Sequence, residues 1–110
     1  MVDEAVRERI ENFISAVRQR GIPISRIVLF GSHARGDAHE WSDIDIVVIS
    51  PLFDGPDLRS AVDMLWEATV STRGHIEPVA CGERRWDDDD GSPILEIARR
   101  EGVEIPLPAP

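Results

Sequence analysis

The 110-residue chain contains no lysine, only one cysteine (Cys81), and neither a long apolar run nor a basic, apolar leader. A single cysteine excludes a disulfide within the chain and a metal site built from cysteines. No apolar stretch approaches the roughly 18 residues that a membrane span needs, and the N-terminal residues lack the apolar segment of a signal peptide. We therefore expect one domain in a reducing, cytoplasmic compartment.

The charge of the chain is strongly one-sided. All 12 basic residues are arginine, 21 residues are acidic, and the formal net charge is −9. Such a surface repels a polyanion, which argues against nucleic acid as the main ligand. A small anion such as a nucleotide can still bind where a divalent metal supplies local positive charge, and an acidic surface suits a basic protein partner.

Hydrophobic periodicity predicts alternating helices and strands. Apolar residues recur at three- and four-residue spacing over residues 3–20, with Asp3 as an N-cap and Gly21 at the end, which predicts a helix. The further predicted elements are strands at 26–30, 43–50 and 75–80, a helical turn at 32–35, a loop at 82–91, and helices at 58–71 and 93–101 after the caps Asp57 and Ser92. Pro78 either shortens the third strand or places it at an edge of the sheet.

This order predicts an α/β (α+β) chain: a small mixed sheet of three or four strands with helices packed on it. Residues 1–102 form the expected domain and residues 103–110 a C-terminal tail, read as a turn or short strand that then frays. The edge strand near 75–80, or the tail, offers a place for a second copy to pair, so a homo-oligomer stays open.

Two aspartates one residue apart open the second strand. Side chains alternate along a strand, so Asp43 and Asp45 share one side while Ile44 and Ile46 are buried on the other. Two close carboxylates repel each other, and a divalent cation removes that repulsion. Oxygen ligands favour Mg²⁺, or Mn²⁺, over zinc.

A third carboxylate, Glu77, lies in the third predicted strand. If that strand neighbours residues 43–50, Glu77 reaches the same cluster, and three carboxylates can hold two metals about 4 Å apart. The carboxylate that faces an acceptor hydroxyl would act as the general base.

The turn after the first strand has the composition of a phosphate-binding turn. Gly31 lets the backbone approach a phosphate, Ser32 offers a hydroxyl, and the amides that follow begin a helix. Arg35 can direct its guanidinium at phosphate oxygens, and Ser42 is placed to orient the Asp43 region.

These residues resemble a known family. Gly-Ser-x-Ala-Arg-Gly at 31–36, six residues, and then Asp-Ile-Asp-Ile at 43–46 are similar to the nucleotidyltransferase superfamily related to polymerase β, and more narrowly to the minimal nucleotidyltransferases (MNT proteins) of prokaryotes. The resemblance covers roughly residues 5–102 and implies the polymerase-β-like nucleotidyltransferase fold.

The resemblance also implies roles and partners. Asp43 and Asp45 would be metal ligands, with Glu77 the best match to the family's third acid, although the wider superfamily commonly has Asp there. Gly31 and Ser32 would bind the triphosphate of ATP or another NTP, and Arg35 would contact phosphate or support the loop. Minimal nucleotidyltransferases often act as antitoxins of HEPN-domain toxins, and some transfer AMP from ATP to a toxin tyrosine.

Each assignment has a simpler alternative. Asp43 and Asp45 can be solvated residues at a strand start, and Glu77 a surface acid on an edge strand. Arg35 can form a loop-locking salt bridge to Asp37 or Asp43. His33, at the variable position of the motif, is a solvent-facing residue near the nucleotide rather than a base, and Trp41 either covers the site or packs on it.

The expected function is therefore Mg²⁺-dependent transfer of AMP, or another NMP, from an NTP to a hydroxyl, with a protein side chain as the favoured acceptor. One rival is an antitoxin that keeps the fold but neutralises its toxin by binding alone. Another is nucleotidylation of a small molecule such as an aminoglycoside, for which the chain has no drug-holding domain.

Overall fold

The structure is a computed structural model that describes residues 2–39, 42–72, 75–88 and 91–109. One expectation falls outside this range, namely that Trp41 covers the site or packs on it. The elements in chain order are α1 (Glu4–Gln19), β1 (Arg26–Phe30), α2 (Ser32–Arg35), β2 (Ile44–Ile49), the 3-10 helix η1 (Pro51–Asp54), α3 (Leu58–Thr72), β3 (Ile76–Cys81), α4 (Glu83–Asp87), α5 (Pro93–Glu101) and β4 (Val103–Ile105). None of the helices in these ranges is long and apolar enough to cross a membrane.

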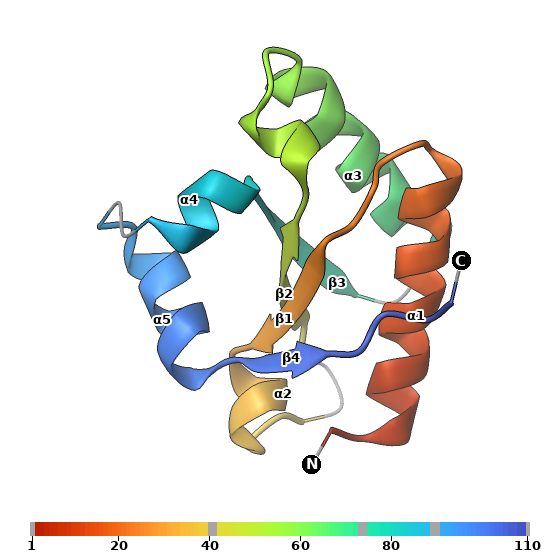
Figure 1. The fold of residues 1–110 in the computed structure, drawn as a ribbon. Coiled ribbons are helices and arrows are strands. Elements are labelled where there is room, and N and C mark those ends of the chain that lie inside the picture. The colour runs from red at the N-terminus through yellow and green to blue at the C-terminus, as the bar shows by residue number, and fades with distance from the viewer. Residues whose placement is uncertain (1, 40–41, 73–74, 89–90, 110) are drawn as a thin grey trace.

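The strands form one mixed sheet in the order β3-β2-β1-β4 (Figure 1). β1 pairs antiparallel with both β2 and β4, whereas β2 and β3 run parallel. The predicted small mixed sheet with helices packed on it is confirmed, and β3 lies at an edge, one of the two alternatives that Pro78 indicated. Because β2 and β3 are parallel, their N-terminal ends meet at the same end of the sheet.

Side-chain alternation divides the core into two layers. On one side of the sheet, α1 and α3 cover a cluster of 18 buried residues that includes Ile27, Leu29, Ile44 and Ile46. We call this side the closed face. On the other side, which we call the open face, α4 and α5 cover only seven buried residues, among them Leu95 and Ala98. Figure 1 shows α1 and α3 on one side of the sheet and α4 and α5 on the other.

The first helix forms as its periodicity predicts. Asp3 Oδ1 accepts a hydrogen bond from the Ala5 N–H at 2.8 Å, which satisfies one of the free donors of the first turn. The buried side chains of α1 form one stripe against the closed face: Val6, Ile10, Phe13, Ile14, Ala16 and Val17.

Two helices were not predicted. Residues 82–91 were expected to be a loop, yet Glu83–Asp87 forms α4. Its first turn receives a cap from a distant residue, because the Arg84 N–H donates to Asp54 Oδ2 at 3.1 Å. The 3-10 helix η1 follows β2 and is capped by Ser50, whose Oγ accepts from the Leu52 N–H at 3.1 Å.

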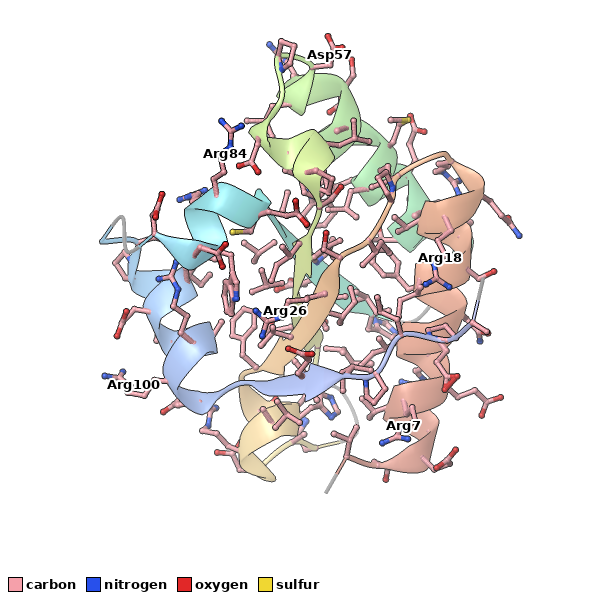
Figure 2. All side chains as sticks on the ribbon, in the orientation of Figure 1. Arg7, Arg18, Arg26, Asp57, Arg84 and Arg100 are labelled. Carbon is pink, nitrogen blue, oxygen red and sulfur yellow. The ribbon has the colours of Figure 1, made fainter. Side chains whose placement is uncertain are left out.

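The C-terminal residues extend the sheet. Val103–Ile105 forms β4, which pairs with β1 and confirms the expected short strand. Arg26 on β1 forms an ion pair with Glu104. Beyond β4, Arg18 Nη1 on α1 donates to the Pro108 carbonyl at 2.8 Å, and Figure 2 shows Arg18 next to this segment. The last described residues therefore pack along α1.

Candidate active site

The two aspartates lie where β2 begins, on the open face. Asp43 precedes the strand and is exposed, whereas Asp45 is half-buried within it. Ile44 and Ile46 are both fully buried in the closed face, as alternation predicted. Asp45 lies opposite Phe30 on one side and Glu77 on the other. The pleat therefore presents both carboxylates on the side of the sheet that the helices cover least.

Glu77 joins these aspartates through strand register. The parallel pairing of β2 and β3 places Glu77 directly beside Asp45. The Glu77 carboxyl lies close enough to Asp43 and Asp45 for their charges to raise its pKa. A three-carboxylate cluster was expected only if the third strand neighbours the second, and β3 does pair with β2.

The electrostatics of this cluster are unfavourable to three negative charges. Desolvation raises the pKa of Asp45 above its usual value, and the charge of Asp43 raises it further, while Glu77, His33 and Arg35 pull it down. Desolvation also raises the pKa of Glu77, followed by the charges of Asp43 and Asp45. Each shift reflects desolvation first and the neighbouring carboxylates second, and a bound cation offsets both costs.

The donor chemistry of this cluster fits a hard divalent cation. It offers carboxylate oxygens from Asp43, Asp45 and Glu77, with no sulfur ligand beside them. Within the described parts of the chain, no group of three or more acidic, histidine or cysteine side chains is arranged to hold a metal ion. The three carboxylates would therefore have to change conformation to bind a metal together.

Gly31 connects the phosphate-binding turn to the aspartates. Its backbone has φ 74° and ψ −153°, a region that is nearly exclusive to glycine. A Cβ on Gly31 would also overlap the Oδ2 atom of Asp45. Both the turn and the position of the Asp45 carboxylate thus depend on the missing side chain.

The short helix α2 and the loop after it hold the remaining predicted residues. Ser32 begins α2, and its carbonyl accepts hydrogen bonds from the N–H groups of Gly36 and Asp37 at 3.0 and 3.1 Å. Arg35 Nε donates to Asp37 Oδ2 at 3.2 Å, so of the two salt bridges considered the structure contains the one to Asp37. The Ser42 hydroxyl accepts from the His39 N–H at 2.9 Å and so stabilises the loop that leads to Asp43.

His33 is closer to the carboxylates than its variable position in the motif suggested. Its Nε2 lies 3.3 Å from the Ser42 carbonyl, and its charge favours the ionised form of Asp45. The histidine thus links α2 to the residue immediately before Asp43. The nine-residue separation carries no signal for this contact, because it arises only in the folded chain.

A family model and two relatives match part of the chain. Residues 10–78, which include Gly31, Asp43, Asp45 and Glu77, match the family model described as "Nucleotidyltransferase domain". Two relatives from Methanocaldococcus jannaschii are similar over part of the chain. One is named "Putative protein adenylyltransferase MJ0604", 45% identical over 43% of this chain, and the other "Putative protein adenylyltransferase MJ1305", 37% identical over 46%. The aligned segments span only 44% and 35% of those relatives.

Two solved structures share the fold. A structure described as a "putative nucleotidyltransferase" from Sulfolobus solfataricus has a TM-score of 0.65 and 19% identity, covering 91% of this chain and 78% of that one. A chain from a crystal structure of a toxin-antitoxin with AMP-PNP has a TM-score of 0.58 and 24% identity, covering 89% and 73%. The family model matches well over half of the sequence, and both folds agree. The chain therefore belongs to the family of nucleotidyltransferase domains.

Proposed function

We propose that this domain transfers AMP, or another NMP, from an NTP to a hydroxyl group of a partner protein in a Mg²⁺-dependent reaction, as the antitoxin of a HEPN/MNT toxin–antitoxin pair. The observation that carries the proposal is the register of Asp45 beside Glu77 at the end of the sheet where Gly31 turns the chain. The names of the two archaeal relatives and of the toxin-antitoxin structure support a protein acceptor.

The proposal assigns a role to each candidate residue. Asp43, Asp45 and Glu77 would hold the metal, while Gly31, Ser32, Arg35 and Ser42 would position the triphosphate or its loop. A bound Mg²⁺ would neutralise charge on the phosphates and on the leaving pyrophosphate. Arg35 is 46% exposed in its pair with Asp37, so it can exchange that partner for a phosphate at little cost.

The chemistry needs a proton acceptor as well as phosphate binding. The acceptor hydroxyl oxygen forms a bond to the α-phosphorus, and the bond from that phosphorus to the pyrophosphate oxygen breaks. The hydroxyl proton passes to a carboxylate of the cluster. Glu77 suits this step by its position, because it is exposed on the edge strand beside Asp45.

Label transfer from ATP tests the proposal. The protein is incubated with Mg²⁺, ATP labelled at the α-phosphate, and the candidate toxin, and the label on protein is measured after gel separation. We expect label on the toxin, lost by a factor of at least about 10³ in the double variant Asp43→Asn with Asp45→Asn. Asp57→Asn, which removes an exposed acid just before α3, is the matched control and should retain full transfer.

The same experiment distinguishes the enzymatic proposal from the alternative of an antitoxin that acts by binding alone. The likeness to a chain of a toxin-antitoxin structure supports that alternative. Absence of label with the wild type, or undiminished label with the double variant, would contradict the enzymatic proposal. Neutralisation of the toxin by the double variant as strong as by the wild type would favour an antitoxin that acts by binding.

A further inference from the structure

The outer face of α3 exposes two large apolar side chains one turn apart. α3 packs on the closed face through Ala61, Leu65 and Ala68, which are nearly or fully buried. On its outer side Trp66 is 47% exposed and Val70 is 80% exposed. Neither exposed surface contributes to the stability of the domain, and tryptophan is enriched at the centres of protein interfaces.

A groove continues this apolar pair toward the candidate active site. Thr69, Val70, His75 and Ile76 line a hollow of ≈ 360 Å³ between the end of α3 and the start of β3. The His75 carbonyl accepts a hydrogen bond at 2.9 Å from the N–H of Ile44, the residue between the two aspartates. Ile76 lies beside Ile44, and the next residue is Glu77. Ile76 faces the closed side and Glu77 the open side, so a protein seated in this groove would reach the carboxylate cluster around the β3 edge of the sheet.

The described charges around the apolar pair are mainly acidic. On a helix the nearest neighbours lie three and four residues away, which places Asp63 before Trp66 and Glu67 before Val70. Both acids are exposed, and Arg59, one turn before Asp63, offsets only part of their charge. With a net charge of −9 over the whole chain, a basic partner meets favourable potentials here and an acidic partner does not.

We propose that the Trp66–Val70 pair and the adjoining groove, together the α3 surface, bind an amphipathic segment of the acceptor protein that presents apolar side chains flanked by Arg or Lys. This inference rests on the proposed function. The carboxylates and the Gly31 turn account for metal and nucleotide binding, and the α3 surface would bind the acceptor protein. A second copy of the chain is the poorer occupant. A two-fold contact uses the same patch twice and would bring Asp63 and Glu67 of both copies together.

Photo-crosslinking locates the occupant without depending on catalysis. Val70 is replaced by p-benzoylphenylalanine in the cells that make the protein, and Ile97 is replaced in a parallel sample. Ile97 is a matched control, because it is also an exposed apolar residue (36%) but lies on α5, on the other side of the sheet (Figure 1). After irradiation, the crosslinked peptide is sequenced by mass spectrometry.

We expect crosslinks from position 70 to one other protein, at least about fivefold above position 97, through a peptide of net positive charge with apolar residues. Crosslinks to a second copy, crosslinks to an acidic peptide, or a yield no higher than at position 97 would overturn the proposal.

Binding measurements on the purified crosslinked partner then test the residues. Trp66→Ala should raise Kd at least tenfold, as expected for a central aromatic contact. Asp63→Asn with Glu67→Gln should raise Kd severalfold and weaken its dependence on salt, since paired surface charges are screened. Ile97→Ala should leave Kd within a factor of two. A Trp66→Ala variant with unchanged Kd and unchanged melting temperature would contradict the proposal.

The double variant Asp43→Asn with Asp45→Asn separates this inference from the proposed function. It should crosslink through position 70 as efficiently as the wild-type background, because the α3 surface does not include the aspartates. If the wild type crosslinks but transfers no label, the proposed nucleotidyl transfer is contradicted and the α3 surface remains supported as a docking site. Label transfer to a protein that position 70 does not reach would remove only the α3 surface.

Discussion

The two faces of one sheet serve different purposes because two helices cover one of them fully and two others cover the second only in part. On the closed face, Ile44 and Ile46 of β2 are fully buried under α1 and α3. On the open face of the same strand, Asp45 sits among carboxylates at one end while Val47 and Ile49 are buried farther along. Alternation along a single strand thus divides residues that stabilise the fold from residues that bear charge.

The difference shows how a domain of this size can tolerate an unfavourable acidic cluster. The larger cluster of 18 buried residues supplies most of the apolar burial, so the open face can leave one end uncovered. The repulsion among Asp43, Asp45 and Glu77 destabilises the metal-free protein, and the closed face offsets it. We expect substitutions on the closed face to change stability, and substitutions at the uncovered end to change chemistry.

We expect the largest loss of stability from Leu→Ala substitutions, which we compare at two equally buried leucines on opposite faces of the sheet. Leu65 on α3 and Leu95 on α5 are both fully buried. Leu65→Ala should lower the free energy of unfolding by roughly 4–5 kcal/mol, and Leu95→Ala by roughly 2–3 kcal/mol, because the smaller layer can collapse onto the cavity more easily. Urea denaturation measures both. Equal losses would contradict the view that the closed face carries the stability of the domain.

We expect a smaller loss of stability from Gly→Ala substitutions at the two glycines that flank α2. Gly31 and Gly36 both have positive φ, 74° and 84°, but only Gly31 lies against Asp45, while a Cβ on Gly36 would meet nothing within 4 Å. Gly36→Ala should cost about 1 kcal/mol of backbone strain, and Gly31→Ala about 2–3 kcal/mol because it adds an overlap with the carboxylate. Thermal melting gives the stabilities. Gly31→Ala should also lose at least tenfold in label transfer, whereas a loss shared equally by Gly36→Ala would argue against a special role of the Gly31 contact.

The smallest expected effect is the pH dependence of the metal-free protein. The pKa values of Asp45 and Glu77 are raised in the folded state, so the folded protein binds these protons more tightly than the unfolded chain. Their contribution to stability is full below the unfolded pKa values of 3.8 and 4.5 and is lost as the pH rises through the raised folded values. Asp45→Asn should therefore stabilise the metal-free protein at pH 7 by less than about 1 kcal/mol, since solvent screens these partly exposed groups.

Thermal melting of chelator-treated samples between pH 4 and pH 8 tests the predicted direction of the stability change with pH. Added Mg²⁺ should reverse the order by stabilising the wild type more than Asp45→Asn. Wild-type protein that gains stability with rising pH relative to Asp45→Asn would show that the carboxylates do not repel one another in solution.

Local patterns in the sequence predict the strands and the sides of the sheet on which Asp43 and Asp45 lie. Strict alternation places Ile44 and Ile46 opposite the aspartates, and the structure confirms it. The position of Glu77 depended on which strands are neighbours, which no local pattern determines. The parallel pairing of β2 with β3 provides that information.

The helix α4, which the sequence did not predict, depends on a contact between distant residues. α4 is capped by Asp54, 30 residues before Arg84, and a Cβ at Gly82 would displace the Asp54 carboxylate from this contact. The contact of His33 with the Ser42 carbonyl likewise requires a folded loop. The metal and nucleotide roles of the site residues remain predictions, because they concern ligands rather than the chain itself.

Paramagnetic broadening by Mn²⁺ tests most directly the claim that the uncovered end of the open face holds metal and nucleotide. Amide signals of ¹⁵N-labelled protein are recorded with Mn²⁺ and a non-hydrolysable ATP analogue, for the wild type, Asp43→Asn with Asp45→Asn, and Asp63→Asn. We predict the strongest broadening at Gly31, Ile44 and Glu77 in the wild type and in Asp63→Asn, and its loss in the double variant. Broadening centred elsewhere, or unchanged in the double variant, would contradict the claim.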